Sequence, residues 1–138
     1  MGSCPEEGLI RRSVAALNAG DIDGYFQGFC PNSLRWVNGL DTPLTLQDVR
    51  ANLNLLTTAF DRLHLREDLL FGASGHVCAR WTLQGIHVGD YGGIAPSRRE
   101  IAVQTCEVYT LADSKVIESW VYGETMSLFN QLAGSAHV

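Results

Sequence analysis

Two kinds of hydrophobic spacing divide this chain, and their order limits the folds that it can adopt. In the first 60 residues, apolar residues recur every three or four positions, as from Leu9 to Leu17 and from Val49 to Phe60, which is the spacing of amphipathic helices. From Leu63 onward apolar and polar residues alternate, as in half-buried strands. Helices followed by a meander of strands predict an α+β fold, in which a curved antiparallel or mixed sheet packs against three N-terminal helices as a cone with an open mouth.

The individual elements follow from the same patterns. We predict helices at 9–17, 21–29 and 45–60, strands at 34–37, 63–71, 77–86, 101–111 and 116–122, and a short helical tail at 127–132. Thr45 is predicted to cap the third helix, and Pro31-Asn-Ser33 to form a turn. The open mouth of such a cone is the default binding site for a small molecule.

The connection between strands 77–86 and 101–111 is too elaborate to be a plain turn. His87 stands in it, two residues from a glycine on each side. A loop of this kind on a rigid scaffold often carries function. Five residues in this stretch interrupt regular structure: Gly85, Gly89, Gly92, Gly93 and Pro96.

Charge and composition exclude several classes of function. A net charge of −5, with basic residues only in pairs, argues against a nucleic-acid surface. Four scattered cysteines without a CxxC spacing predict no metal site, and we interpret them as reduced thiols of a cytoplasmic protein. No apolar stretch could span a bilayer and no signal peptide is visible, so no membrane partner is expected. We expect residues 1–138 to form one domain.

The end of the last predicted strand carries the strongest candidate for chemistry. In a straight strand Trp120, Tyr122 and Glu124 share one face. A carboxylate beside two aromatic rings is poorly solvated, and burial raises its pKa toward the range useful for proton transfer. The alternative is that Glu124 is an exposed residue at the start of a helix.

Four other residues are weaker candidates. Asn52 in the third helix has an amide that could donate to a substrate oxygen, or it could lie on the surface. His87 is either functional or makes a structural hydrogen bond across the hairpin. The alternation around Glu107 is ambiguous, so this residue faces either the same interior as Tyr109 or the other side of the strand. Trp36 is either part of the core or part of a ligand wall.

Several motifs in the same order along the chain carry a family resemblance. Gly85-Ile-His-Val-Gly-Asp90 and Gly93-Ile-Ala-Pro-Ser-Arg98 are similar to the signature G-T-H-x-G-(E/D)…G-(I/M)-x-P-T-G-R, with Ser-Arg in place of Thr-Gly. Asp113-Ser-Lys-Val-Ile-Glu-Ser-Trp120 resembles a last hairpin that usually contains Asp-Gly-Lys-Ile, and Gln131-Leu132 resembles the usual ending. Together these motifs resemble the SnoaL-like polyketide cyclases over nearly the whole chain.

The resemblance implies an α+β barrel of the nuclear-transport-factor-like superfamily, usually a homodimer or larger, without metal or organic cofactor. The family's cyclases close a ring by intramolecular aldol condensation, in which a carboxylate removes a carbon-bound proton. Its catalytic aspartate corresponds to Glu124, and Asn52 matches an asparagine found in the pocket of some members. Leu17 and Thr110 stand where some of these cyclases carry a pocket tyrosine and a histidine.

We therefore predict a cofactor-independent polyketide tailoring enzyme, a cyclase or isomerase that acts on a polycyclic aromatic or polyketide-derived intermediate. Glu124 is the predicted acid/base, while Asn52 and His87 orient substrate oxygens. Two alternatives stay open: an enzyme of epoxide opening or hydroxylation-coupled tailoring, and a non-catalytic module that holds a hydrophobic intermediate. The predicted substrate contacts are Trp36, Glu107, Trp120 and Tyr122.

Overall fold

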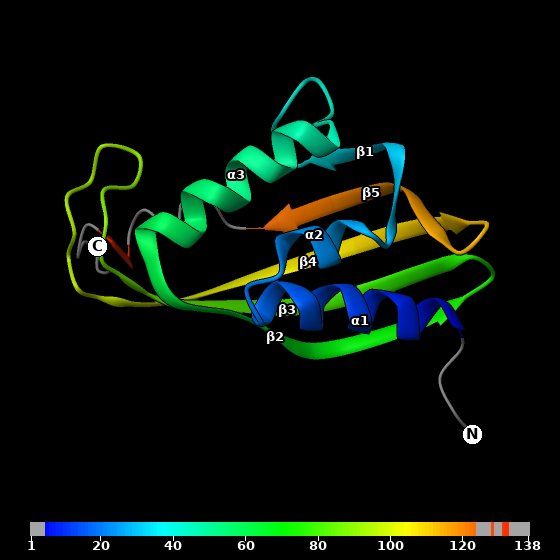
Figure 1. The fold of residues 1–138 in the computed structure, drawn as a ribbon, viewed down its shortest axis with the longest axis horizontal. Coiled ribbons are helices and arrows are strands. Elements are labelled where there is room, and N and C mark those ends of the chain that lie inside the picture. Colours follow the sequence, from blue (N-terminus) through cyan, green and yellow to red (C-terminus); the bar gives the residue numbers. More distant parts are fainter. Residues whose placement is uncertain (1–4, 124–127, 129–130, 133–138) are drawn as a thin grey trace.

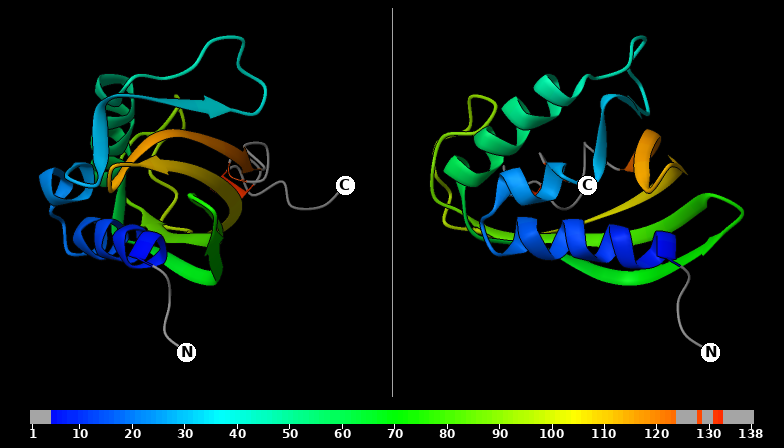
Figure 2. Two further views of the ribbon diagram at one scale, coloured as in Figure 1. Left: turned by 90° about the vertical axis from the view of Figure 1, so that its right-hand side faces the viewer. Right: turned by 45° about the vertical axis from the view of Figure 1, so that its right-hand side comes forward.

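The chain folds as a curved sheet with three helices on one side, which confirms the predicted α+β class (Figure 1 and Figure 2). The computed structural model describes residues 5–123, 128 and 131–132. In chain order the elements are α1 (Pro5–Asn18), α2 (Ile22–Phe26), β1 (Phe29–Val37), α3 (Leu46–Ala59), β2 (Phe60–Ala73), β3 (His76–His87), β4 (Glu100–Ala112) and β5 (Lys115–Gly123).

The sheet is mixed and open. Its strand order is β1-β5-β4-β3-β2, so the first and last strands of the chain lie side by side. The pairs from β2 to β5 are antiparallel, whereas β1 runs parallel to β5. Figure 2 shows how the strands bend around the helices, so that the helices cover the concave face.

Strand β1 differs from its prediction. The segment Pro31-Asn-Ser33, expected to be a turn, lies inside the strand, and the register with β5 shifts between Phe29 and Leu34. A proline is tolerated there because β1 is an edge strand and the shift leaves an irregular segment that needs no ladder hydrogen bond. Pro31, Asn32 and Ser33 do favour a turn locally. Pairing with a strand 84 to 87 residues later in the chain outweighs this local preference.

The helices present their apolar stripes to the concave face of the sheet. Thr45 caps α3 through a capping box with Asp48, in which each side chain bonds the backbone N–H of the other residue. The buried residues of α3 recur at helical spacing, and those of β3 and β4 alternate. Among the most deeply buried apolar members of this core are Ile10, Val49, Val77, Trp81 and Val116.

The loop after β3 is fastened to the end of α3. The backbone N–H groups of Val88 and Gly89 both donate to the carbonyl oxygen of Ala59, at 2.8 and 2.9 Å. A Cβ on Gly89 would lie 3.0 Å from the carbonyl oxygen of Thr58, so only glycine fits this approach without a shift.

The tail predicted at 127–132 lies mostly outside the described residues. Of its described members, Leu128 and Leu132 are buried in the core. The Gln131 side chain accepts from the backbone N–H of Ala102 at 2.9 Å and donates to its carbonyl oxygen at 3.0 Å. These two bonds satisfy the backbone N–H and carbonyl groups of Ala102 in β4. Ala102 lies before Thr105, the first β4 residue that pairs with β5.

Candidate functional site

A cavity of about 450 Å³ lies between the helices and the concave face of the sheet. This volume is within the range of sites that hold drug-sized molecules. Most of its wall is apolar, and α3 and β2 contribute more of the lining residues than the other elements do. Among the lining residues are Leu17, Val49, Leu53, Leu56, Trp81 and Leu83.

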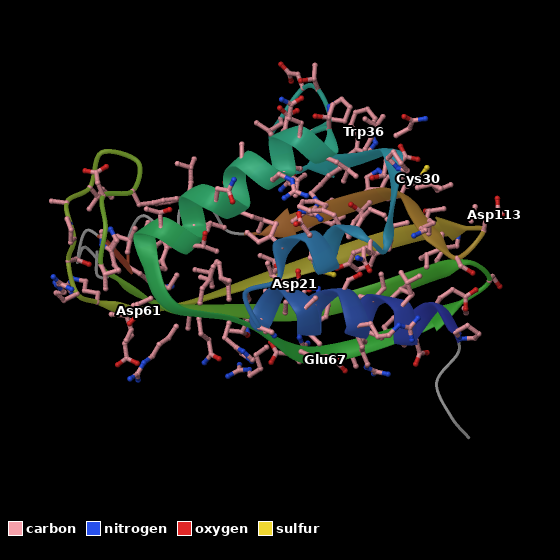
Figure 3. The ribbon with its side chains drawn as sticks, in the orientation of Figure 1. Asp21, Cys30, Trp36, Asp61, Glu67 and Asp113 are labelled. Atoms are coloured by element: carbon pink, nitrogen blue, oxygen red, sulfur yellow. The ribbon has the colours of Figure 1, made fainter. Side chains whose placement is uncertain are left out.

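The cavity opens to solvent near the junction of α3 and β2, where its lining residues are exposed. Thr57, Asp61 and His64 line it and are exposed, and Figure 3 labels Asp61 at this junction. Asn52 also lines the cavity from the exposed side of α3. Asn18 closes the end of α1 against β2, because its side chain bonds both the N–H and the carbonyl oxygen of Leu65, at 2.8 and 3.0 Å.

A buried polar cluster interrupts the apolar wall. Arg35 on β1 and Glu107 on β4 form an ion pair with 3.3 Å between Nη2 and Oε2, and both side chains are at most 15% exposed. The same Arg35 nitrogen donates to the hydroxyl oxygen of Tyr25 at 2.7 Å. Tyr109, buried on β4 two residues beyond Glu107, is part of the same electrostatic neighbourhood. The cluster therefore holds two opposite charges and two phenols out of bulk water, and all of its members except Tyr109 line the cavity.

The pKa shifts in this cluster have separable causes. Burial raises the pKa of Tyr109 well above its ordinary value and also raises that of Tyr25, and the Glu107 charge adds to both effects. For Arg35, burial alone acts to lower the pKa, but the attraction of Glu107 and the contact with Tyr25 outweigh it, so the pKa is raised. Near neutral pH the guanidinium is therefore charged and both phenols keep their protons.

The sequence prediction did not identify Arg35, Tyr25 or Tyr109 as site residues. Arg35 stood in a short apolar strand, and a single arginine between Leu34 and Trp36 is the one local signal of an inward charge. Its partner is 72 positions away in the sequence, and the pairing depends on β1 lying beside β5. Glu107, by contrast, was a candidate, and its side chain lies in the cavity wall.

His87 is fully buried and ties the loop after β3 together. It does not line the cavity itself, but its ring packs against Phe60, which does, with 5.4 Å between the ring centroids. The backbone N–H of Ser97 donates to its Nδ1 at 3.0 Å, so Nδ1 is the acceptor and Nε2 carries the proton. Its backbone bonds Arg98 and Arg99 across the same loop. Within the described residues Nε2 is enclosed and has no hydrogen-bond partner. These contacts agree with the alternative in which His87 makes a structural hydrogen bond across the hairpin.

The aromatic side chains expected to wall the pocket lie on the outer face of the sheet. Val37 and Val121 line the cavity, and strand alternation turns Trp36, Trp120 and Tyr122 the opposite way. Trp36 donates from Nε1 to Glu118 at 2.6 Å, and Figure 3 labels it on β1 at the edge of the sheet. The structure does not bring these three side chains to the cavity.

Glu124 lies outside the described residues. The strand that leads to it ends at Gly123, which is paired with Thr105, and Thr105 lines the cavity. The chain therefore leaves β5 beside the cavity wall. Among the predicted site residues, the structure brings Asn52 and Glu107 to one cavity.

Neither a metal site nor a membrane-spanning helix is present among the described residues. In the described part of the chain, no group of three or more His, Cys, Asp or Glu residues is arranged to hold a metal ion. None of the described helices combines the length and the apolar character that crossing a membrane requires.

Several solved structures share this fold. AclR from Streptomyces galilaeus, a proposed hydroxylase, is 22% identical over 94% of this chain and 96% of its own, with a TM-score of 0.86. IdmH from Streptomyces antibioticus, a proposed polyketide cyclase, is 16% identical over 93% and 98%, with a TM-score of 0.83. TsrD from Streptomyces laurentii is 22% identical over 96% and 97%, with a TM-score of 0.81. At these identities the likeness shows the fold alone.

Sequence comparison gives the family. No curated protein is similar enough to this chain to count as a match. The family model described as SnoaL-like polyketide cyclase, however, matches residues 8–132, which is nearly the whole chain and includes every element of the sheet. The match agrees with the motifs around the histidine loop and with a cavity enclosed between helices and a curved sheet. The chain therefore belongs to the SnoaL-like polyketide cyclase family.

Proposed function

We propose that this protein is a cofactor-independent polyketide tailoring enzyme, a cyclase or isomerase that transfers protons through a carboxylate. Its substrate is a polycyclic aromatic or polyketide-derived intermediate held in the 450 Å³ cavity. Family membership and a mainly apolar cavity with a few polar groups support this assignment. The proposal treats residues 1–138 as one domain that works in the cytoplasm.

The choice of Glu124 as the acid/base rests on the family resemblance and on where β5 ends. Strand β5 contributes Val121 to the cavity wall and ends at Gly123 opposite the cavity residue Thr105. Because Trp120 and Tyr122 point to the outer face, the proposal requires the chain to depart from strand alternation after Gly123. A carboxylate there would meet an acidic C–H of a bound ketone and return the proton to the new alkoxide. Asn52 at the opening is the proposed hydrogen-bond donor to a substrate oxygen. His87 acts by holding the loop in place.

Proton exchange tests this assignment without knowledge of the natural substrate. The α-protons of 2-tetralone exchange in D₂O, and NMR follows the rate with and without the protein. We expect Glu124→Gln to lower the protein-dependent rate by about 100-fold or more, since an amide cannot accept the proton. Glu118→Gln is the matched control, because Glu118 is on the same strand but bonds Trp36 on the outer face.

Four outcomes would contradict the assignment. Full exchange by the Glu124→Gln variant would exclude this residue as the base, and an equal loss in Glu118→Gln would show a structural effect. Tight ligand binding by the wild type without any catalysed exchange or product would favour the non-catalytic module. Incorporation of oxygen from labelled water or O₂ into the product would favour epoxide opening or hydroxylation.

We also propose that the protein is a homodimer that pairs through the outer face of the sheet. Cross-strand neighbours form one mainly apolar row over all five strands, and its end residue, Phe71, is 53% exposed. A second copy would remove this row from water. The row consists of Trp36, Trp120, Val108, Cys78 and Phe71.

Sedimentation equilibrium tests the dimer with a matched pair of variants. Phe71→Asp places a charge in the proposed interface and is expected to give a monomer. Leu40→Asp is the control, because Leu40 is 52% exposed but lies in the turn after β1, off the sheet. A monomeric wild type, or equal dissociation by both variants, would contradict the interface.

A further inference from the structure

The Arg35–Glu107 pair places a cation and an anion next to each other in an otherwise apolar wall. The other charged residues that line the cavity, Asp61 and Arg62, are exposed at its opening. The pair lies deeper, with side chains 15% and 9% exposed. Its two charges cancel, so its net attraction for an anionic or a cationic ligand is small.

Hydrogen bonding within the pair is incomplete. Arg35 uses Nη2 for Tyr25 and for the ion pair. Arg35 Nε and Glu107 Oε2 are enclosed, and neither has a hydrogen-bond partner within residues 5–123 or the described positions of the tail. Polar atoms without partners are costly when buried. Because Arg35 and Glu107 both line the cavity, a small turn of either side chain would bring these atoms to a ligand that supplies the missing bonds.

We propose that the Arg35–Glu107 pair recognises a neutral hydroxy-ketone unit of the substrate, one in which a hydroxyl group neighbours a carbonyl. The guanidinium donates to the carbonyl oxygen and the carboxylate accepts from the hydroxyl. A ketone alone leaves the carboxylate unsatisfied, and a methyl ether in place of the hydroxyl adds bulk without a donor. A free carboxylate is disfavoured because it meets Glu107 beside Arg35.

This inference rests on the proposed function in one respect, which is that the cavity is the substrate site. It names the class of substrate and requires neither Glu124 nor turnover. Arg35 and Glu107 are therefore specificity residues, and binding is the measurement that tests them.

Three small ketones show how much the hydroxyl donor contributes to binding beyond the carbonyl group. Calorimetric titration of the wild type with 2-hydroxy-1-tetralone, 2-methoxy-1-tetralone and 1-tetralone compares the same ring system with a donor, with a blocked donor and without either. Bonds to charged groups predict that the hydroxy-ketone binds about 10-fold more tightly than the other two. 2-Naphthoate, an anion of similar size, is expected to bind more weakly than the hydroxy-ketone.

Variants of Arg35 and Glu107 then test whether this pair causes the preference for the hydroxy-ketone. Glu107→Leu and the double variant Arg35→Met/Glu107→Leu are expected to bind the three ketones with equal affinity, and circular dichroism verifies that each is folded. Arg80→Gln on the outer face is the control and keeps the wild-type preference.

Equal affinities in the wild type overturn the inference and need no variant. Tightest binding of 2-naphthoate overturns it too, since the site would then select an anion. Absence of saturable binding by all ketones overturns both this inference and the proposed function, whereas loss of proton exchange alone affects only the latter.

Discussion

Removal of one member of the buried Arg35–Glu107 pair should destabilise the protein far more than removal of both. Arg35→Met leaves the Glu107 carboxylate enclosed without its counter-charge and deprives Tyr25 of its hydrogen bond. Glu107→Leu leaves the guanidinium with the Tyr25 hydroxyl and the Phe29 ring but without a counter-charge. Breaking a buried pair typically costs 3–5 kcal/mol, and because this pair adjoins a cavity that water can enter, we expect a loss of about 3 kcal/mol for each single variant.

The double variant Arg35→Met/Glu107→Leu should lose only about 1 kcal/mol, since no unpaired charge stays in the interior. Urea unfolding at pH 7, followed by tryptophan fluorescence, gives the free energy of unfolding of all four proteins. For a chain of 138 residues, a single-variant loss of this size corresponds to a fall of roughly 10 °C in melting temperature. Arg80→Met, an exposed arginine on the outer face, is the control and should change stability by less than about 0.5 kcal/mol.

Additivity would refute this reasoning. If the double variant lost the sum of the two single losses, the side chains would contribute through packing and not through each other. Single losses below about 1 kcal/mol would show that water solvates the pair as it does a surface salt bridge.

Two further predictions concern other parts of the fold. Thr45→Ala should lower the free energy of unfolding by about 1 kcal/mol, because the α3 capping box disappears, whereas Thr42→Ala in the preceding loop should not; equal effects would argue against the cap. In urea titrations above pH 10, stability should fall as pH rises, because the unfolded chain releases the Tyr109 proton near the ordinary pKa of 10.0 while the folded chain retains it. Each tyrosine that keeps its proton only in the folded state contributes about 1.4 kcal/mol per pH unit to the fall in the free energy of unfolding, and Tyr109→Phe should remove the contribution of Tyr109. If this substitution left the slope unchanged, Tyr109 would ionise freely in the folded protein.

Local patterns were sufficient to predict most of the fold. Helical spacing in the first 60 residues and alternation after them are properties of short windows, and Thr45 carries its cap in its own neighbourhood. The partner of β1 is not a local property. Strand β1 pairs with residues 84 to 87 positions later and extends through Pro31, and no turn rule applied to residues 31–33 could show this.

The candidate site was less accessible to such reasoning. Alternation places Trp36, Trp120 and Tyr122 on one face, but apolar side chains occupy both faces of this sheet, so the pattern alone does not say which face is inside. The cluster of Arg35, Glu107 and Tyr25 joins β1, β4 and α2, and it exists only once β5 lies between β1 and β4.

The parallel pairing of β1 with β5 also affects how the chain acquires its fold during synthesis. Residues 29–37 leave the ribosome long before residues 115–123 exist, so the N-terminal helices and β1 must wait for the last strand. Closing so long a loop carries an entropic cost before any contact forms, which places this sheet among the slower topologies. In the finished protein Trp36 and Trp120 are cross-strand neighbours, and Trp36 bonds Glu118. The fluorescence of this pair therefore reports the last step of sheet assembly, when the beginning and the end of the chain meet.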